Sequence, residues 1–331
     1  MKTCVTRRAF LTAGVGLAAT AAAGIVTTAA ASAAAPDDHL ATLIDITKCI
    51  GCGACVEACR MANTAKFPNP VKPFPKMYPG RVKVSDWSDR RDVVDRLTPY
   101  NWLIIQEATV SVNGETYGLT FPRRCMHCVN PPCVKLCPWG AARQYPNGIS
   151  RIDTGMCLGG SKCQAVCPWD IPQRQTGDGL YLRLLPSFAG NGIMNKCDRC
   201  YDRVAGGGLP ACIEACPENV QSIGPRKEIL ARAHELARGM NGFLYGENEN
   251  GGTNTIYVSP VPFDRLQAAI DTGPGRPHLN PVADAMADAE ILGKAMLMAP
   301  FAGVAAAAGK LAAAVRKGQA PSHGHSGDGD G

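Results

Sequence analysis

The residues of this chain whose type and spacing most clearly indicate chemistry are its cysteines. Fifteen of the 16 fall into four short runs. In order along the chain these are CIGCGACVEAC (Cys49, Cys52, Cys55, Cys59), CMHCVNPPCVKLC (Cys125, Cys128, Cys133, Cys137), CLGGSKCQAVC (Cys157, Cys163, Cys167) and CDRC…CIEAC (Cys197, Cys200, Cys212, Cys216). Proline directly follows the last cysteine of the second, third and fourth runs. Thiolates are soft ligands that select zinc and iron–sulfur clusters, so the runs predict metal binding.

The spacing within the runs favours iron–sulfur clusters. In C-x2-C-x2-C three thiolates surround one cubane, and a fourth cysteine three residues on binds the other cluster of a pair. Proline after that cysteine suits the start of a helix. Disulfides are the first alternative, but four thiols within eleven residues suit metal wrapping better than bridging. Structural zinc is the second, and only the fourth run loosely resembles its spaced pairs. The expected fold is α+β, with tandem pseudo-symmetric two-cluster ferredoxin units of the bacterial type and inserted strands.

The third run lacks one cysteine of the pattern. Counting from Cys157, the second position is occupied by Gly160. The cluster there would take Cys157, Cys163 and Cys137 of the second run, which leaves one iron corner without a thiolate. We expect a [3Fe–4S] cluster. The alternative is a [4Fe–4S] cluster whose open iron binds solvent or Ser161, and an open iron could also bind a substrate.

The N-terminus reads as an export signal. Residues 6–11 are TRRAFL, a twin-arginine motif, followed by an Ala-rich apolar stretch and a cleavage site, ASA, at 31–33. We expect residues 1–33 to be a twin-arginine signal peptide recognised by the twin-arginine export machinery, with an ordinary secretory peptide or a membrane anchor as the alternative. This route exports folded proteins, which suits clusters that are inserted before export. Removing the segment takes away Lys2, Arg7 and Arg8 and no acid, so the formal net charge falls from +6 to +3, too mild to indicate a nucleic-acid partner.

A second apolar segment lies near the C-terminus. Residues 295–315 are interrupted only by Pro300 and Lys310, and about 20 apolar residues span a bilayer core. Lys310 is near the end, where it can reach the headgroups, and Arg316 and Lys317 place that end in the cytoplasm. We expect residues 291–317 to form a single transmembrane helix that anchors a periplasmic protein in the inner membrane, with an amphipathic or surface-packed helix as the alternative. Residues 318–331 read as a disordered tail.

Between these ends the sequence predicts a four-cluster domain at residues 34–240, with an insertion at 60–122 and an extension at 241–290. Within the insertion, residues 101–112 alternate as a strand does, and Asn113-Gly114 predicts a tight hairpin into a strand at 116–121. Five prolines between positions 68 and 79 predict an irregular arm. Further on we expect strands at 220–223 and 255–258 and a helix from Pro225 to Gly239.

The remaining candidate residues give little sign of a different active site. The sequence has no Gly-rich phosphate loop, nucleophile elbow or carboxylate pair. His127 and His234 have no obvious catalytic partner, so we interpret each as a surface or packing residue; His127 lies between two cluster ligands, where it could instead tune a potential. Six basic residues beside the runs either offset the negative charge of the clusters or are plain surface charges: Arg60, Arg124, Lys135, Lys162, Lys196 and Arg199.

Together these features resemble the electron-transfer (beta) subunits of the dimethyl-sulfoxide-reductase and formate-dehydrogenase type, in particular the iron–sulfur subunit that accompanies periplasmic [NiFe] hydrogenases of the hydrogenase-2 kind. The resemblance covers nearly the whole chain and rests on TRRAFL, CMHCVNPPCVKLCP, GGLPACIEACP, the LYGENENGGT turn and the C-terminal apolar helix. Gly160 is a departure, because hydrogenase-type relatives usually keep a complete third run. In the related nitrate-reductase subunit a Trp replaces the same cysteine and the centre is [3Fe–4S].

The resemblance implies the ligand sets of four centres. Three [4Fe–4S] clusters would be held by Cys49, Cys52, Cys55 and Cys216, by Cys59, Cys197, Cys200 and Cys212, and by Cys125, Cys128, Cys133 and Cys167. The fourth centre is the three-cysteine one at Cys137, Cys157 and Cys163. We call these, in this order, the first to fourth cysteine sets.

The function implied is an electron relay without a substrate site of its own. It would link a periplasmic catalytic subunit, that of a [NiFe] hydrogenase with its large and small subunits, to an integral membrane subunit that reacts with quinone. In that family the fourth centre lies toward the membrane. The same relay could serve a molybdopterin enzyme with molybdenum or tungsten, of the formate, tetrathionate, polysulfide or sulfite type. Alternatives of another class are an enzyme that uses an open iron near Gly160 and a zinc scaffold without redox chemistry.

Overall fold

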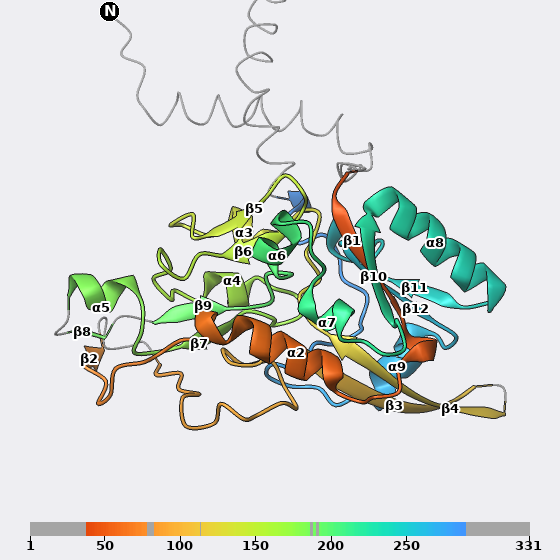
Figure 1. The fold of residues 1–331 in the computed structure, drawn as a ribbon, viewed down its shortest axis with the longest axis horizontal. Helices are drawn as coiled ribbons and strands as arrows, with labels where there is room; N and C mark the ends of the chain where they lie inside the picture. The colour runs from red at the N-terminus through yellow and green to blue at the C-terminus, as the bar shows by residue number, and fades with distance from the viewer. Residues whose placement is uncertain (1–37, 78–82, 113, 186–187, 190–191, 289–331) are drawn as a thin grey trace, which may run out of the picture. The chain divides into compact units, whose positions relative to one another are not determined.

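A computed structural model of the chain, shown in Figure 1, describes residues 38–77, 83–112, 114–185, 188–189 and 192–288. All of these residues except 287 and 288 belong to one unit of the chain, Ala33–Met286. The expected signal peptide (1–33), the expected membrane helix (291–317) and the tail (318–331) lie outside the described residues. Among the helices that are described, none has the length and apolar character needed to cross a membrane.

A four-stranded sheet and one long helix form one end of this unit. The strand order is β10–β1–β12–β11, from β1 (Leu40–Asp45), β10 (Gln221–Pro225), β11 (Phe243–Tyr245) and β12 (Thr255–Ser259). β1 is antiparallel to β10 and parallel to β12, with Leu43 opposite both Ser222 and Ile256. Helix α8 (Arg226–Gly239) packs on the sheet (Figure 1). Its buried side chains recur every four residues on one helix face and meet the alternate side chains of β1 and β12: Ile229, Ala233 and Ala237 against Ala41, Leu43, Ile256 and Val258.

The predicted hairpin is confirmed, with shifted ends. Strand β3 (Ile104–Val112) pairs antiparallel with β4 (Glu115–Arg123), in a register that sets Ile104 opposite Arg123 and Val112 opposite Glu115. The first strand starts three residues later than expected, because Asn101 pairs with Thr98 and the Trp102 indole donates to the Pro99 carbonyl, which closes a local turn. Alternate side chains of the hairpin enter the main core, and α9 (Phe263–Ala269) packs on β3.

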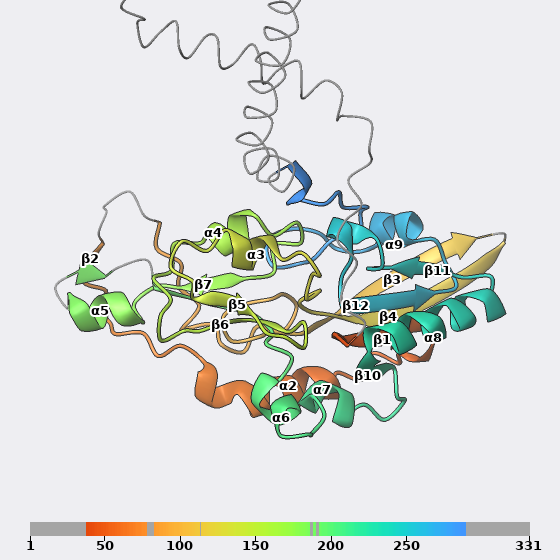
Figure 2. The same cartoon turned by 90° about the horizontal axis from the view of Figure 1, so that it is seen from above.

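Short helices carry or follow the cysteine runs. They are α2 (Ala54–Asn63), α3 (Pro132–Lys135), α4 (Lys162–Ala165), α6 (Tyr201–Ala205) and α7 (Ala211–Glu214). α2 packs against α7, and α3 against α4, so the first run meets the fourth and the second meets the third. In Figure 2 the group α2, α6 and α7 is seen apart from the group α3 and α4. The fold is thus a mixture of helices and strands around two paired groups of runs.

The other elements are small. Two short ladders join β5 (Ala142–Gln144) to β6 (Ser150–Ile152) and β7 (Gln173–Gln175) to β9 (Ile193–Asn195). The proline-rich arm carries only the two-residue strand β2 (Lys76–Met77), paired with β8 (Phe188–Ala189), in its described part. Single turns and one short helix complete the list: η1 (Ile46–Lys48), η2 (Thr64–Lys66), η3 (Glu249–Gly251) and α5 (Leu180–Leu184). The strands expected at 220–223 and 255–258 and the helix at 225–239 are confirmed to within two residues as β10, β12 and α8.

Candidate iron–sulfur sites

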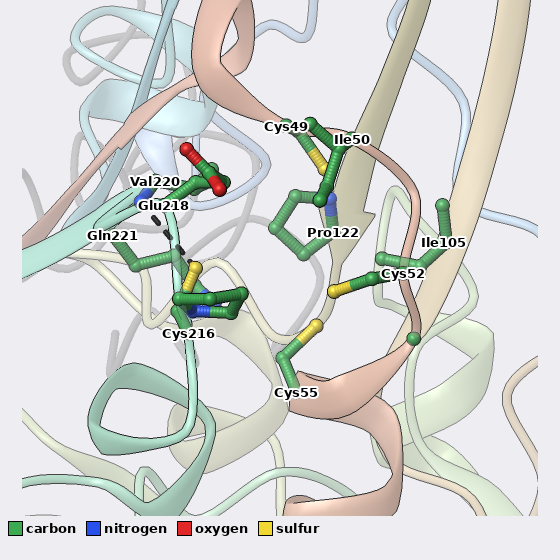
Figure 3. A pocket seen from close by; sticks show the side chains of 12 residues that line it. Cys49, Ile50, Cys52, Cys55, Ile105, Pro122, Cys216, Glu218, Val220 and Gln221 are labelled. Atoms are coloured by element: carbon green, nitrogen blue, oxygen red, sulfur yellow. Dashed lines mark hydrogen bonds between the residues drawn. The ribbon is translucent and has the colours of Figure 1, made fainter.

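The first cysteine set surrounds one cavity. Cys49, Cys52 and Cys55 come from the loop between η1 and the start of α2, and Cys216 follows α7. Figure 3 shows the four sulfur atoms turned toward a common space, which the four cysteines line together. The loop can curl around this space because Gly51 and Gly53 have φ of 70° and 76°, a left-handed conformation that residues with a Cβ rarely adopt. From the other side, the backbone N–H of Val220 donates to the Cys216 sulfur at 3.4 Å.

The second cysteine set is buried between the two packed helices α2 and α7. Cys59 lies one helical turn after Cys55 on α2, Cys212 lies on α7, and Cys197 and Cys200 precede α6. All four side chains are less than 8% exposed. Burial raises the pKa of the Cys59 thiol well above its usual value, and the neighbouring Cys197, Cys212 and Cys200 raise it further. These four thiols therefore lie close enough to interact strongly.

The third cysteine set lines a second cavity. Cys125, Cys128 and Cys133 come from the second run, and Cys167 from the end of the third. His127 between the first two has φ of 47°, which turns the loop around the cavity, and its N–H lies 3.5 Å from the Cys125 sulfur. The arrangement repeats that of the first set: three thiols from one run and a fourth borrowed from its paired run.

The fourth set brings together Cys137, Cys157 and Cys163. Burial raises the pKa of Cys163 to about 12, and among the thiols that add to this shift are Cys157 and Cys137. Backbone N–H groups face these sulfurs: Ala142 donates to Cys137 at 3.5 Å, and Gly159 and Met194 donate to Cys157 at 3.4 Å.

Gly160, the position without a cysteine, is exposed, and a Cβ built there would meet no atom within 4 Å. Ser161, the alternative ligand, has φ of 55°, and its hydroxyl lies 3.4 Å from the Gly159 carbonyl and 3.5 Å from the Met194 sulfur. The set therefore consists of three thiols, with open space at the position where the pattern expects a fourth.

The electrostatics of the four sets fit a ligand with several positive charges. Burial raises the pKa of Cys55 and Cys197 to about 12 and of Cys133 to about 11, and nearby thiols add to each shift. Thiolates so close together repel one another unless bound metal supplies positive charge, and metal binding releases the thiol protons. The thiols of a set surround a space rather than a point: in the described part of the chain no three or more His, Cys, Asp or Glu side chains lie close enough to share a single metal ion. The residues fit iron–sulfur clusters.

Comparison with known proteins decides the family. Two family models, each described as a 4Fe-4S dicluster domain, match residues 48–141 and 116–226. The iron–sulfur subunit of nitrate-inducible formate dehydrogenase from Escherichia coli K12 is 31% identical over 237 residues, which cover 66% of this chain and 68% of that protein. The chain belongs to this family of iron–sulfur subunits. The resemblance seen in the sequence is thereby confirmed.

Other relatives of this iron–sulfur subunit extend the match. The hydrogenase-2 operon protein HybA of Escherichia coli O157:H7 is 30% identical over 262 residues, which cover 69% of this chain and 72% of that protein. A protein of Nitratidesulfovibrio vulgaris Hildenborough is 31% identical over 265 residues, or 78% of this chain, and the match spans 65% of that protein. The similarity thus reaches relatives named for hydrogenase and for formate dehydrogenase alike.

The six basic residues beside the cysteine runs, which the sequence does not distinguish, differ in burial. Arg124, Lys196 and Arg199 are buried, whereas Arg60 is half-buried and Lys135 and Lys162 are exposed. The Arg124 guanidinium donates to the Cys212 sulfur of the second set at 2.7 Å. Burial lowers the pKa of Arg124, but Cys212 and Cys197 more than offset this, and its pKa is raised. The side chains of two buried residues therefore donate to cysteine sulfurs. Arg124 donates to Cys212, and Lys196 donates to Cys125 at 3.5 Å.

Arg199 has a different role. Its guanidinium donates to the carbonyls of Leu40 and Asn254 and to the Thr255 hydroxyl, so it joins the starts of the two central strands, β1 and β12, to the loop of the second set. Burial is the main cause that lowers its pKa to about 9. The Arg199 side chain thus stabilises the position of the cysteine loop, and its backbone N–H donates to the Cys197 sulfur at 3.4 Å.

The two histidines also differ. His127 is fully buried, and its Nδ1 accepts a hydrogen bond from the Ser150 N–H at 3.2 Å, so the proton of the neutral ring lies on Nε2. Burial and then the cations of Arg199, Lys196 and Arg124 lower its pKa well below the usual value. His234 is on the surface, 3.0 Å from Glu247. The assignment of both as packing or surface residues is in line with these positions.

Proposed function

We propose that the protein relays electrons through four iron–sulfur clusters, held by the four cysteine sets. The observation that carries this proposal is the continuity of the sets. Cys55 and Cys59 join the first and second across one turn of α2, about 6 Å of helix. Lys196 contacts the Cys125 sulfur of the third set and the Cys197 carbonyl of the second. Cys133, within the short helix α3, and Cys137, two residues after its end, join the third and fourth.

The exposure of the sets suggests where electrons enter and leave. The second set is buried throughout, and in the third only Cys167 is half-buried. In the first set Cys52 is exposed, next to Ile50 with 64% of its surface accessible. In the fourth, Cys137 is half-buried, and the exposed Trp139 follows it by two residues. We assign the inner sets to transfer and the outer two to exchange with partners.

For cofactors we propose three [4Fe–4S] clusters on the first, second and third sets and a [3Fe–4S] cluster on the fourth. The open space at Gly160 and the three thiols of that set support the last assignment. When bound, the clusters supply one-electron chemistry. The chain positions the thiolates, keeps water from the inner sets, and aims N–H groups at the sulfurs, which favours the reduced, more negative clusters. The protein has no substrate site of its own in this account.

For partners we propose a periplasmic catalytic subunit and an integral membrane subunit that reacts with quinone. The relative named for the hydrogenase-2 operon supports a [NiFe] hydrogenase as the catalytic partner. The relatives named for formate dehydrogenase support the second candidate, a molybdopterin enzyme. Export by the twin-arginine machinery and a C-terminal membrane anchor remain proposals based on residues 1–33 and 291–317.

The partner is tested by metal analysis of the native complex. Membranes are solubilised in mild detergent without oxygen, the tagged chain is isolated with its partners, and the co-purifying metals are measured. Nickel with excess iron would identify a hydrogenase, and molybdenum or tungsten would identify a molybdopterin enzyme with the relay unchanged. Iron alone, with no large partner, would contradict the relay and favour an enzyme that uses the open iron near Gly160.

A further inference from the structure

Lys196 is a buried lysine at the junction of the second and third cysteine sets. It lies between the end of β9 and Cys197, and only 5% of its surface is exposed. Its ammonium donates to the Cys125 sulfur at 3.5 Å, to the Cys197 carbonyl at 3.1 Å and to the Ser150 carbonyl. A lysine ammonium has three N–H donors, and here all three have acceptors. The charged head is therefore fixed in one position.

The scaffold around Lys196 belongs to the cavity of the third cysteine set. Lys196 lines this cavity together with the cysteines of the third set, His127 and Ser150. The backbone of Ser150 connects two of these residues, since its N–H donates to the His127 ring and its carbonyl accepts from Lys196. A single residue at the start of β6 thus holds both side chains against the third set.

The position of this charge matters because the surroundings do not screen it. A charge in the protein interior interacts several times more strongly with its neighbours than one in water. Lys135 and Lys162, which stand beside the cysteine runs in the sequence, are exposed, and solvent screens them. Of the six basic residues beside the runs, Lys196 has hydrogen bonds to residues of two cysteine sets at once.

We propose that Lys196 is a fixed positive charge that stabilises an added electron on both inner clusters and so raises their reduction potentials. This inference rests on the proposed relay. An electron that arrives on one of these clusters comes from its neighbour in the relay, which loses one electron. The receiving cluster gains one negative charge and Lys196 keeps its proton. Net charge near a cluster and hydrogen bonds to its sulfurs are both known to set its potential.

The geometry also predicts which of the two inner clusters should change its reduction potential more when Lys196 is replaced. Lys196 contacts a sulfur of the third set directly but reaches the second set through the Cys197 carbonyl, so the third cluster should respond more. The second cluster has a further cation of its own, Arg124 on the Cys212 sulfur. Backbone N–H groups donate to sulfurs of inner and outer sets alike, such as His127 to Cys125 and Val220 to Cys216, whereas the hydrogen bonds of Lys196 to cysteine residues reach the second and third sets. Loss of Lys196 should therefore affect two of the four potentials.

The test uses the full-length holoprotein, purified without oxygen, and redox titration followed by electron paramagnetic resonance. Lys196→Met removes the charge at nearly the same length, and Lys196→Arg retains it. Lys227→Met is the matched control, because Lys227 is exposed on α8. We expect Lys196→Met to lower two of the four midpoint potentials, one more than the other, while Lys196→Arg and Lys227→Met leave all four near the wild-type values.

The outcomes separate the two proposals. If the wild-type protein does not contain four clusters, the relay itself is wrong. If it does, and the potentials of Lys196→Met do not move or all four move equally, the role of Lys196 is wrong and the relay stands. Should Lys196→Met fail to retain iron, Lys196→Gln, which keeps donors for the two carbonyls, is titrated in its place with the same expected and contradicting results.

Discussion

Gly160→Cys restores a thiol at the position where the third run departs from the cysteine pattern. The substitution is sterically easy, since a Cβ there meets no atom within 4 Å, the residue is exposed, and its φ is outside the left-handed region. An exposed change of this kind, with a glycine replaced, alters the free energy of unfolding by less than about 1 kcal/mol. Any large effect must therefore come from the cluster and not from the fold.

The expected result is conversion of the fourth centre into a cubane. Iron should rise from about 15 to about 16 atoms per chain, because one more iron gains a thiolate ligand. The oxidised wild-type protein should show the paramagnetic signal of a [3Fe–4S] cluster, and Gly160→Cys should lose it, because an oxidised [4Fe–4S] cluster is diamagnetic. The assays are iron and sulfide analysis and electron paramagnetic resonance of the protein as isolated without oxygen. Gly160→Ala, which adds a Cβ but no thiol, is the control and should keep the signal.

Two results would refute this reasoning. A Gly160→Cys protein that keeps the three-iron signal at full strength would mean that position 160 does not face the vacant corner. A native complex that loses all activity in Gly160→Cys, with its clusters intact, would mean that the open corner performs catalysis. A relay should instead retain activity, at most with slower electron transfer.

Three further predictions concern stability. Arg124→Gln removes a charged donor from the buried Cys212 sulfur and should lower the free energy of unfolding by about 2–3 kcal/mol. The loss is measured as a lower temperature at which the cluster absorbance disappears. Arg124→Lys, which keeps a charged donor, should recover part of it. Ile229→Ala opens a hole under α8 and should cost about 2–4 kcal/mol without moving any potential, while exposed Lys227→Ala should change stability by less than about 0.5 kcal/mol. Burial lowers the pKa of His39, so below pH 6.5 the unfolded chain binds a proton that the folded chain does not. The free energy of unfolding should therefore fall as the pH drops from 7.5 to 5.5, and it should fall less steeply in His39→Gln. An equal dependence on pH in His39→Gln and the wild type would contradict this.

The sequence was a good guide wherever local chemistry decides the structure. Asn113-Gly114 predicted the hairpin of β3 and β4, and Pro225 and Gly239 bracket α8 closely. The start of β3 was predicted three residues too early, because the turn before it is closed by the backbone pairing of Thr98 with Asn101 and by the Trp102 indole, and alternation does not reveal these contacts.

Strand β11 was not predicted, because residues 243–245 precede a Gly- and Asn-rich stretch that reads as a turn. They form a strand through pairing with β12, where Tyr245 lies opposite Tyr257. Such pairing joins the strand to a neighbour, so no pattern within three residues reveals it. Tyr245 is further held by the Trp169 indole, at 2.8 Å, from a distant part of the chain.

The cysteine runs predicted metal binding, whereas the four ligand sets were implied by the resemblance and stay predictions; in the structure the cysteines of the first set line one cavity and those of the third set line another. The runs did not predict which basic residues matter, because Arg124 and Lys196 stand beside cysteines in the sequence just as Lys135 and Lys162 do. What distinguishes them is burial, which depends on how the paired runs pack. For Lys196 the sequence does contain a sign of burial. It directly precedes a cysteine, and the apolar pair Ile193-Met194, which is buried in the structure, lies just before it.

The central claim, four clusters held by four cysteine sets, is tested most directly by iron and sulfide analysis together with electron paramagnetic resonance of the protein purified without oxygen. The account predicts about 15 iron and 16 sulfide ions per chain, one three-iron signal in the oxidised state, and interacting four-iron signals that develop on stepwise reduction. Zinc in place of iron, or two clusters in place of four, would contradict it.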